Sequence, residues 1–330
     1  MHHPVTRRQW LSASVAAAAL LQAGVLRAET YPSRPVRIVV PFAPGGGADT
    51  WSRIIGQRLS EELHQPVVMD SRPGASGVIG SRYVARSAPA DGYTLLFGTG
   101  TNITLGPLAM KSPGFDFEQD LAPVAGLSLQ PLFIAVPADS PFRTLAELVE
   151  AGRKEGNKLS FGSTGMGSLT HVAGLVLNKS AQTSLLHVPY KGGAPLGLAL
   201  LTAEVSCSFI IGNDAMPHVK AGKIRLLGVT AARRSPFSPQ VPTMREAGLA
   251  DFPDLAAWFA FFVRAGTPAD IVDLLNRRIV RYVAEPANQA RLEQTMAEPW
   301  TASPGELMAA LRQEAQSLGP ILKAAGIALD

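Results

Sequence analysis

Short apolar runs alternate along this chain with segments whose apolar residues recur every three or four positions. Val36–Phe42 is a β-branched run, and Trp51, Ile55 and Leu59 share one face of the helix predicted over Ala48–Leu63. This alternation repeats, so we expect parallel sheets covered by helices. Further strands are predicted at Pro66–Met69, Tyr93–Gly98, Leu132–Val136, Leu159–Gly162, Leu185–Val188, Val205–Ile211, Ile224–Thr230 and Trp258–Val263, and further helices at Thr144–Arg153, Ala269–Tyr282, Gln289–Met296 and Pro304–Ala325.

The length of the chain and two connecting segments predict two α/β domains. At roughly 150 residues per domain, 330 residues suggest two. The crossings are expected at Ala122–Pro131 and Asp251–Trp258, which makes the first domain discontinuous (29–130 with 255–330) and the second continuous (131–254). Two lobes joined by two strands form a hinge with a cleft between them, and ligands in such sheets bind at the carboxyl ends of strands.

A glycine-rich loop follows the first strand. The run from Pro41 to Thr50 contains three consecutive glycines and opens a helix, so free backbone N–H groups would favour an anion there. The alternative is a tight turn capped by Asp49 or Thr50. The loop has neither the spacing of a Walker loop nor that of a dinucleotide fingerprint. Its candidate ligand-binding residues are Phe42, Gly46, Gly47, Ala48 and Asp49.

A second loop of similar composition lies in the other predicted domain. It runs from the strand at Leu159–Gly162 into a helix for which Ser168 is a natural N-cap. Two such loops, one in each domain, could face each other across the cleft and hold one acid; the alternatives are turn chemistry for the loop and a structural hydrogen bond for its histidine. The candidate residues here are Ser163, Thr164, Gly165, Ser168 and His171, with Thr99 and Phe209 as further walls of the cleft.

The charge of the chain is concentrated at its N-terminus. The first 28 residues contain Arg7, Arg8 and Arg27 and no acid, which leaves 27 basic and 26 acidic residues in the remainder. The near balance argues against a nucleic-acid partner. The basic start, an apolar segment and a small-residue end at Ala28 predict a signal peptide over residues 1–28 and an exported mature protein; an ordinary secretory route and a twin-arginine route both fit.

No enzyme or metal motif stands out. The single cysteine, Cys207, excludes a disulfide framework, the histidines lack metal-ligand spacing, and no cofactor motif is present. A hydrolase that uses Ser76, Ser163 or His171 stays open as an alternative, as does a ligand-sensing partner of a membrane signalling protein.

Taken together, these segments resemble the substrate-binding receptors of tripartite tricarboxylate transporters, the Bug or TctC family. The resemblance covers essentially the whole mature chain and rests on Pro35–Asp49, Arg72–Gly80, Ala90–Leu96, Phe161–His171, His187–Gly193, Pro217–Arg225, Val229–Pro236, Val241–Gly248, Trp258 and Ala265–Pro268.

This resemblance implies a two-lobed periplasmic binding protein of type II-like α/β fold, with two parallel-rich sheets flanked by helices and a cleft between its domains. It also implies that the protein captures a small carboxylate, without a cofactor or a metal, and delivers it to membrane permease subunits. In the family, the loops that match Phe42–Asp49 and Ser163–Ser168 hold the ligand carboxylate through backbone N–H groups and water. The chain has Ile210 where the family commonly has aspartate, so we expect a more apolar pocket that suits a mono- or dicarboxylate or an aromatic acid better than an amino acid.

Overall fold

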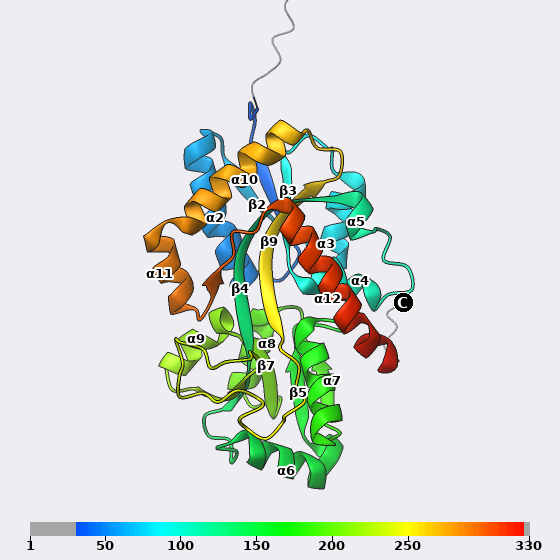
Figure 1. The fold of residues 1–330 in the computed structure, drawn as a ribbon, viewed down its shortest axis with the longest axis vertical. Coiled ribbons are helices and arrows are strands. Elements are labelled where there is room, and N and C mark those ends of the chain that lie inside the picture. Colours follow the sequence, from blue (N-terminus) through cyan, green and yellow to red (C-terminus); the bar gives the residue numbers. More distant parts are fainter. Residues whose placement is uncertain (1–30, 327–330) are drawn as a thin grey trace, which may run out of the picture. The chain divides into compact units, whose positions relative to one another are not determined.

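The structure, a computed structural model, describes residues 31–326, and the compact unit that contains the whole sheet begins at Arg34. Figure 1 shows its helices and strands. The predicted signal peptide, residues 1–28 with its cleavage site near Ala28, lies outside the described residues.

Three parallel strands form the base of one part of the sheet, which we call lobe 1. β1 (Val36–Val40) pairs in parallel with β2 (Val67–Ser71) on one side and β3 (Thr94–Gly98) on the other. Their carboxyl ends therefore share one edge, where the loops after β1 and β3 meet. The helical segments that connect these strands and follow β3 are α2 (Gly47–Leu63), η1 (Ala75–Gly77), α3 (Val78–Arg82), η2 (Tyr83–Ser87), η3 (Thr101–Leu105), α4 (Gly106–Leu108) and α5 (Phe117–Asp120).

Two long antiparallel strands continue from lobe 1 into the rest of the sheet. β4 (Leu121–Pro137) pairs with β9 (Ala256–Arg264) over residues 121–131, and then with β7 and β8 over residues 132–137. The segment predicted only as a crossing, Ala122–Pro131, is thus part of a 17-residue strand. The predicted boundary at residues 130 and 131 coincides with the change of pairing partner, and the domain limits stay a prediction.

The part of the sheet beyond that change, which we call lobe 2, repeats the parallel arrangement. In it, β5 (Ser160–Ser163) pairs in parallel with β6 (Leu186–Pro189) and β7 (Cys207–Ile211), while β8 (Ile224–Val229) lies antiparallel to β4. The helices of lobe 2 are α6 (Leu145–Glu155), η4 (Gly156–Lys158), α7 (Leu169–Ala181), α8 (Gly193–Leu201) and α9 (Gly212–Lys220). The capping box predicted at the start of α6, between Thr144 and Glu147, is confirmed.

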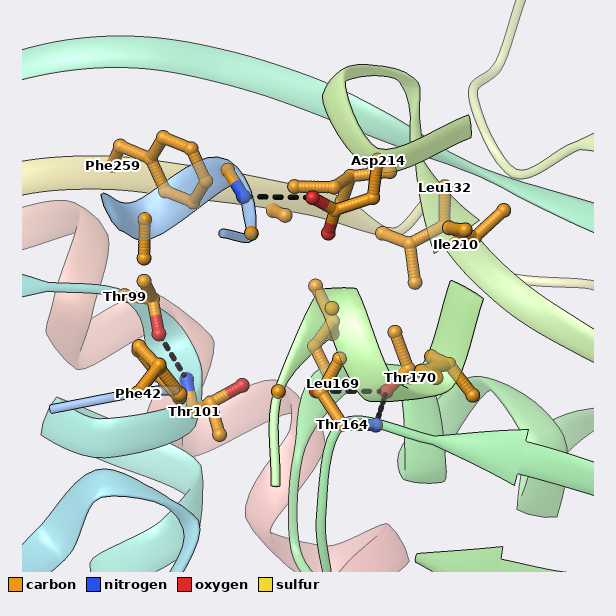
Figure 2. Close-up of a pocket in the computed structure, with 18 of the residues that line it drawn as sticks. Phe42, Thr99, Thr101, Leu132, Thr164, Leu169, Thr170, Ile210, Asp214 and Phe259 are labelled. Atoms are coloured by element: carbon orange, nitrogen blue, oxygen red, sulfur yellow. Dashed lines mark hydrogen bonds between the residues drawn. The ribbon is translucent and has the colours of Figure 1, made fainter. Parts of the chain in front are cut away.

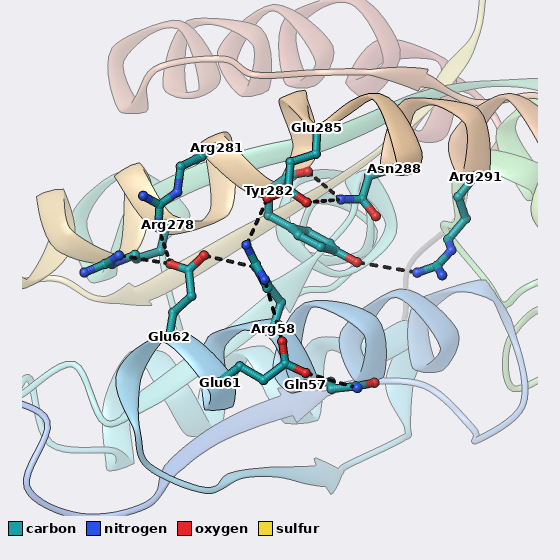
Figure 3. A network of polar contacts seen from close by, with 10 residues as sticks. All are labelled: Gln57, Arg58, Glu61, Glu62, Arg278, Arg281, Tyr282, Glu285, Asn288 and Arg291. Carbon is teal, nitrogen blue, oxygen red and sulfur yellow. Dashed lines mark hydrogen bonds and ion pairs between the residues drawn. The ribbon is translucent and has the colours of Figure 1, made fainter.

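The C-terminal segment returns to lobe 1 as α10 (Ala269–Ala284), α11 (Pro286–Gln294), the short β10 (Glu298–Pro299) and α12 (Pro304–Ala324), and the end of α12 also packs against the core of lobe 2 through Leu318 and Leu322. An ionic network joins α10 to α2 (Figure 3). At its centre the carboxylate of Glu62, 9% exposed, lies 3.0 Å from Arg58, 3.2 Å from Arg278 and 2.7 Å from Arg281. A partly buried carboxylate that is paired this way holds the two helices in register.

Aromatic side chains fill the core on both sides of the change in pairing. In lobe 1, the ring of Phe97 meets Phe259 at 4.9 Å and Phe261 at 5.5 Å, both edge-on. In lobe 2, Phe209 stacks on Phe252 at 6.1 Å. Phe97 is buried on β3 and Phe209 on β7, so the core fixes where the segments that follow these strands begin.

Candidate functional site

One pocket is lined by residues of both lobes, and we call it the main pocket (Figure 2). Its volume is about 70 Å³. Among the described residues that line it, none is a lysine, an arginine or a histidine. The lining consists of Phe42, Ala43, Gly46, Gly47, Ala48, Thr99, Thr101, Leu132, Thr164, Leu169, Thr170, Gly192, Gly193, Leu196, Ile210, Ile211, Asp214, Ala257 and Phe259. The pocket is thus an apolar chamber with four threonines and one carboxylate.

The loop after β1 leaves the start of α2 without a side-chain cap. Gly45 adopts φ +91°, a conformation that glycine accepts readily, and its N–H donates to Asp49 Oδ2 at 3.1 Å. Asp49 also pairs with Arg53, so its carboxylate serves the turn rather than the pocket. The N-cap of α2 is Gly46, which has no side chain to cap the first turn. The first N–H groups of α2 therefore need partners from elsewhere.

One of those partners is Asp214, from the first turn of α9. Its Oδ1 accepts the N–H of Gly47 at 2.7 Å, which joins lobe 1 to lobe 2 (Figure 2). Burial raises the pKa of this carboxyl above its usual value, although the hydrogen bonds from Gly47 and Asn213 act in the opposite direction.

The loop after β5 satisfies most of its polar groups internally. Ser168 caps α7 by accepting the N–H of His171 at 3.2 Å, and the N–H of Thr164 donates to Thr170 Oγ1 at 2.9 Å. Ser163 Oγ lies 2.6 Å from His187 Nε2 and accepts the N–H of Gly165 at 3.2 Å. Its side chains therefore brace the loop from within.

Two histidines stack behind this second loop. The rings of His171 and His187 lie 3.7 Å apart and nearly parallel. Burial lowers the pKa of His171 to about 3, with a further contribution from His187, and burial lowers the pKa of His187 to about 4. Both rings are neutral at pH 7. His171 Nδ1 accepts the N–H of Gly167 at 3.0 Å, which leaves its proton on Nε2.

The loop after β3 contributes two threonines to the pocket. Asn102 Oδ1 accepts the N–H of Thr99 at 2.8 Å, and the N–H of Thr101 donates to Thr99 Oγ1 at 3.2 Å. These bonds fix the turn and present both threonines to the pocket.

The structure brings together half of the residues that the sequence singled out. Those that line the main pocket are Phe42, Gly46, Gly47, Ala48, Thr99 and Thr164. The other six are Asp49, Ser163, Gly165, Ser168, His171 and Phe209; of these, Gly165 lines a neighbouring hollow, Phe209 lies in the core against Phe252, and the rest support the loops. As ligand contacts, all twelve stay a prediction.

Several lining residues were missed by sequence reasoning. Gly192 and Gly193 follow strand β6 and open α8, the same signal that marked the first loop. Asp214 gave no signal, because its partner Gly47 is 167 positions away. Ile210 does line the pocket in place of the family's aspartate, yet Asp214 supplies a carboxylate there.

The geometry gives little support to nucleophilic catalysis. Ser163 is fully buried, and its hydroxyl is tied to His187 and to the backbone of Gly165. Burial raises the pKa of Cys207 to about 12, so this thiol stays protonated at neutral pH. Within residues 31–326, no group of three or more His, Cys, Asp or Glu side chains is placed to hold a metal ion.

Comparison with known proteins identifies the family. A family model described as tripartite tricarboxylate transporter family receptor matches residues 52–327. The chain belongs to this receptor family. It is 37% identical over 283 residues to a UPF0065 protein from the tcbD-tcbE intergenic region of Pseudomonas sp. strain P51, covering 86% of this chain and 83% of the relative. It is 31% identical over 308 residues to protein BugT of Bordetella pertussis, covering 93% of this chain and 94% of BugT.

Solved structures of the family share the fold. A Rhodopseudomonas palustris protein with adipate matches with a TM-score of 0.87 and 33% identity, covering 91% of this chain and all of the other. The periplasmic binding protein BugD matches with a TM-score of 0.85 and 32% identity, again covering 91% of this chain and all of the other. The predicted two-lobed α/β fold is confirmed. None of the helices within residues 31–326 is both long and apolar enough to cross a bilayer.

Proposed function

We propose that this receptor is exported, captures a small carboxylate in the main pocket and delivers it to membrane permease subunits of a tripartite tricarboxylate-type transporter. Membership of the receptor family supports this proposal, and so do the two related structures with bound acids: the one with adipate, and MatC of Rhodopseudomonas palustris with malate, which is 29% identical with a TM-score of 0.82 over 88% of this chain and all of that one.

The observation that carries the proposal is the chemistry of the pocket lining. Helix α2 begins without a side-chain cap, and its first residues, Gly47 and Ala48, line the pocket, so an anion there would meet the N–H groups of a helix start. Threonine hydroxyls provide further donors. Leu132, Ile210 and Phe259 form apolar walls, which suit the methylene chain of a dicarboxylate or the ring of an aromatic acid.

Binding would close the lobes by population shift. A ligand whose carboxylate meets the loop after β1 and whose body meets α7 and α8 gains contacts from both lobes only when they are together. The closed state is then favoured by the difference in affinity.

Isothermal titration against a panel of acids tests the proposal. The panel holds adipate, malate, succinate and benzoate, and the protein is first unfolded, washed and refolded to remove any copurified ligand. We expect at least one acid to bind with a Kd of about 1 µM or below. Absence of detectable binding for every acid of the panel would contradict the proposal.

A matched pair of variants locates the site. Ala257 lines the pocket, whereas Ala256 is its exposed neighbour on β9, and successive side chains on a strand point to opposite faces. Ala257→Phe places a ring in the pocket and should abolish binding, while Ala256→Phe should leave it intact. Equal affinities for the two variants would place the ligand elsewhere.

Transport is tested separately from binding. Crosslinking of the exported protein in cells should capture permease subunits. Capture of a membrane sensor protein instead would contradict delivery to a permease and support a role in ligand sensing.

A further inference from the structure

The carboxylate of Asp214 lies where three helices begin. Its Oδ1 accepts the N–H of Gly47, the first residue of α2, and Asp214 itself stands in the first turn of α9. The first residue of α8, Gly193, lies so close that a Cβ built there would be 1.9 Å from Asp214 Oδ2. The side chain is therefore packed among backbone groups of α2, α8 and α9 (Figure 2).

The position of Asp214, at helix starts, favours an anion. Helix starts present unpaired N–H groups and the positive end of the helix dipole. In this structure the carboxyl group of Asp214 takes up the N–H of Gly47. Burial raises the pKa of this carboxyl group, whereas the positive ends of α2, α8 and α9 favour its ionised form, and it is this form that competes with a ligand. A ligand carboxylate brought to the same donor would meet a like charge at close range, and the described lining residues include no cation to offset it.

An ionised carboxylate has no proton to donate, so it discriminates between acids by whether they can donate a hydrogen bond to it. An acid with only ionised carboxyl groups can neither accept nor donate a hydrogen bond with Asp214, because both partners are acceptors. An acid with a hydroxyl beside its carboxylate can donate that hydroxyl to Asp214 while its own oxygens accept N–H groups of the helix starts.

We propose that Asp214 sets the specificity of this receptor: it competes with the ligand carboxylate for the N–H of Gly47, and so favours hydroxy acids over acids that carry ionised carboxyl groups alone. The inference rests on the proposed function of the main pocket and names the substrate class of that site.

The experiment combines two ligands with two variants. Malate and succinate have the same carbon chain and differ by one hydroxyl. Asp214→Asn keeps an oxygen that can accept the N–H of Gly47 but removes the charge. The matched control is Asp251→Asn, which neutralises an exposed aspartate outside the pocket lining. Titration calorimetry gives six affinities, those of the unmodified protein and of the two variants for each acid, and thermal melting shows that each variant is folded.

We expect the unmodified protein to prefer malate over succinate at least tenfold. Asp214→Asn should reduce that preference to less than threefold, mainly by tightening succinate, while Asp251→Asn should leave it unchanged. An unmodified protein that binds neither acid while Asp214→Asn binds succinate would also support the inference. An unchanged preference, or equal weakening of both acids in Asp214→Asn, would overturn it and leave the proposed function standing. No binding by any variant would overturn both.

Discussion

The loops after β1 and after β5 look alike in sequence and differ in what completes their hydrogen bonds. In the loop after β1, Gly46 provides no side-chain cap, and the N–H of Gly47 is taken by Asp214 from the other lobe. In the loop after β5, Ser168 caps the helix and Thr170 takes the N–H of Thr164. The first loop can exchange its partner for a ligand, and the second has its partners built in. In this chain we therefore expect the loop with glycine at its helix start to contact the ligand, and the loop with serine and threonine to support the site.

The largest effect should come from the histidine pair behind the second loop. Their folded pKa values, about 3 and about 4, lie below the ordinary 6.5, so the unfolded chain binds more protons in acid. The stability they contribute is complete above pH 6.5 and is lost as the pH falls towards the folded values. Between pH 6 and pH 4 we expect each imidazole to cost about 1.4 kcal/mol per pH unit.

Urea unfolding at a series of pH values measures this loss. His187→Gln should remove about half of the slope, whereas His64→Asn, at an exposed position, should leave the slope unchanged. A slope that His187→Gln does not alter would mean that other groups titrate.

The next effect isolates the first loop. Gly47→Pro removes the N–H that we assign to ligand binding, and proline is well tolerated at the first position of a helix. The added Cβ would meet the amide end of Asn213, a side chain that can move, and would lie 3.3 Å from Asp214 Oδ1. Because a charge-assisted hydrogen bond contributes about 1.5–3 kcal/mol, we expect carboxylate affinity to fall about 10- to 100-fold. Calorimetry checks the affinity, and unchanged affinity would remove Gly47 from the site.

The smallest effect on binding should come from the second loop. Ser163→Ala leaves His187 Nε2 and the N–H of Gly165 without their partner in a buried setting. We expect a loss of about 1–3 kcal/mol in the free energy of unfolding with affinity preserved. From sequence alone Ser163 was a ligand contact; a loss of affinity without a loss of stability would restore that prediction.

Most of the fold could be predicted because it depends on local patterns. The apolar periodicity of Ala48–Leu63 and of the C-terminal helices matches the observed elements closely. The full length of β4 could not be predicted, because Pro123, Gly126 and Pro131 interrupt its apolar pattern. Pairing with β9 over residues 121–131 and with β7 and β8 over residues 132–137 overrides that local preference. Helix α9 was hidden by Pro217.

The candidate site was predictable only where one segment carries the whole signal. Gly46 and Gly47 could be singled out because they belong to a run of glycines that directly follows a predicted strand. Asp214 and His187 depend on contacts between segments far apart in the chain, at separations of 167 and 24 residues. The Asp214 contact is fixed by the packing of the two lobes and the His187 contact by the pairing of strands within lobe 2, and neither leaves a local pattern.

The amide resonance of Gly47 tests the central claim most directly. In ¹⁵N-labelled protein titrated with the tightest-binding acid of the panel, the Gly47 signal should shift strongly and saturate at the affinity that calorimetry gives. The signal of Thr164, whose N–H is held by Thr170, should move much less. A Gly47 signal that stays still while the acid binds would contradict the account.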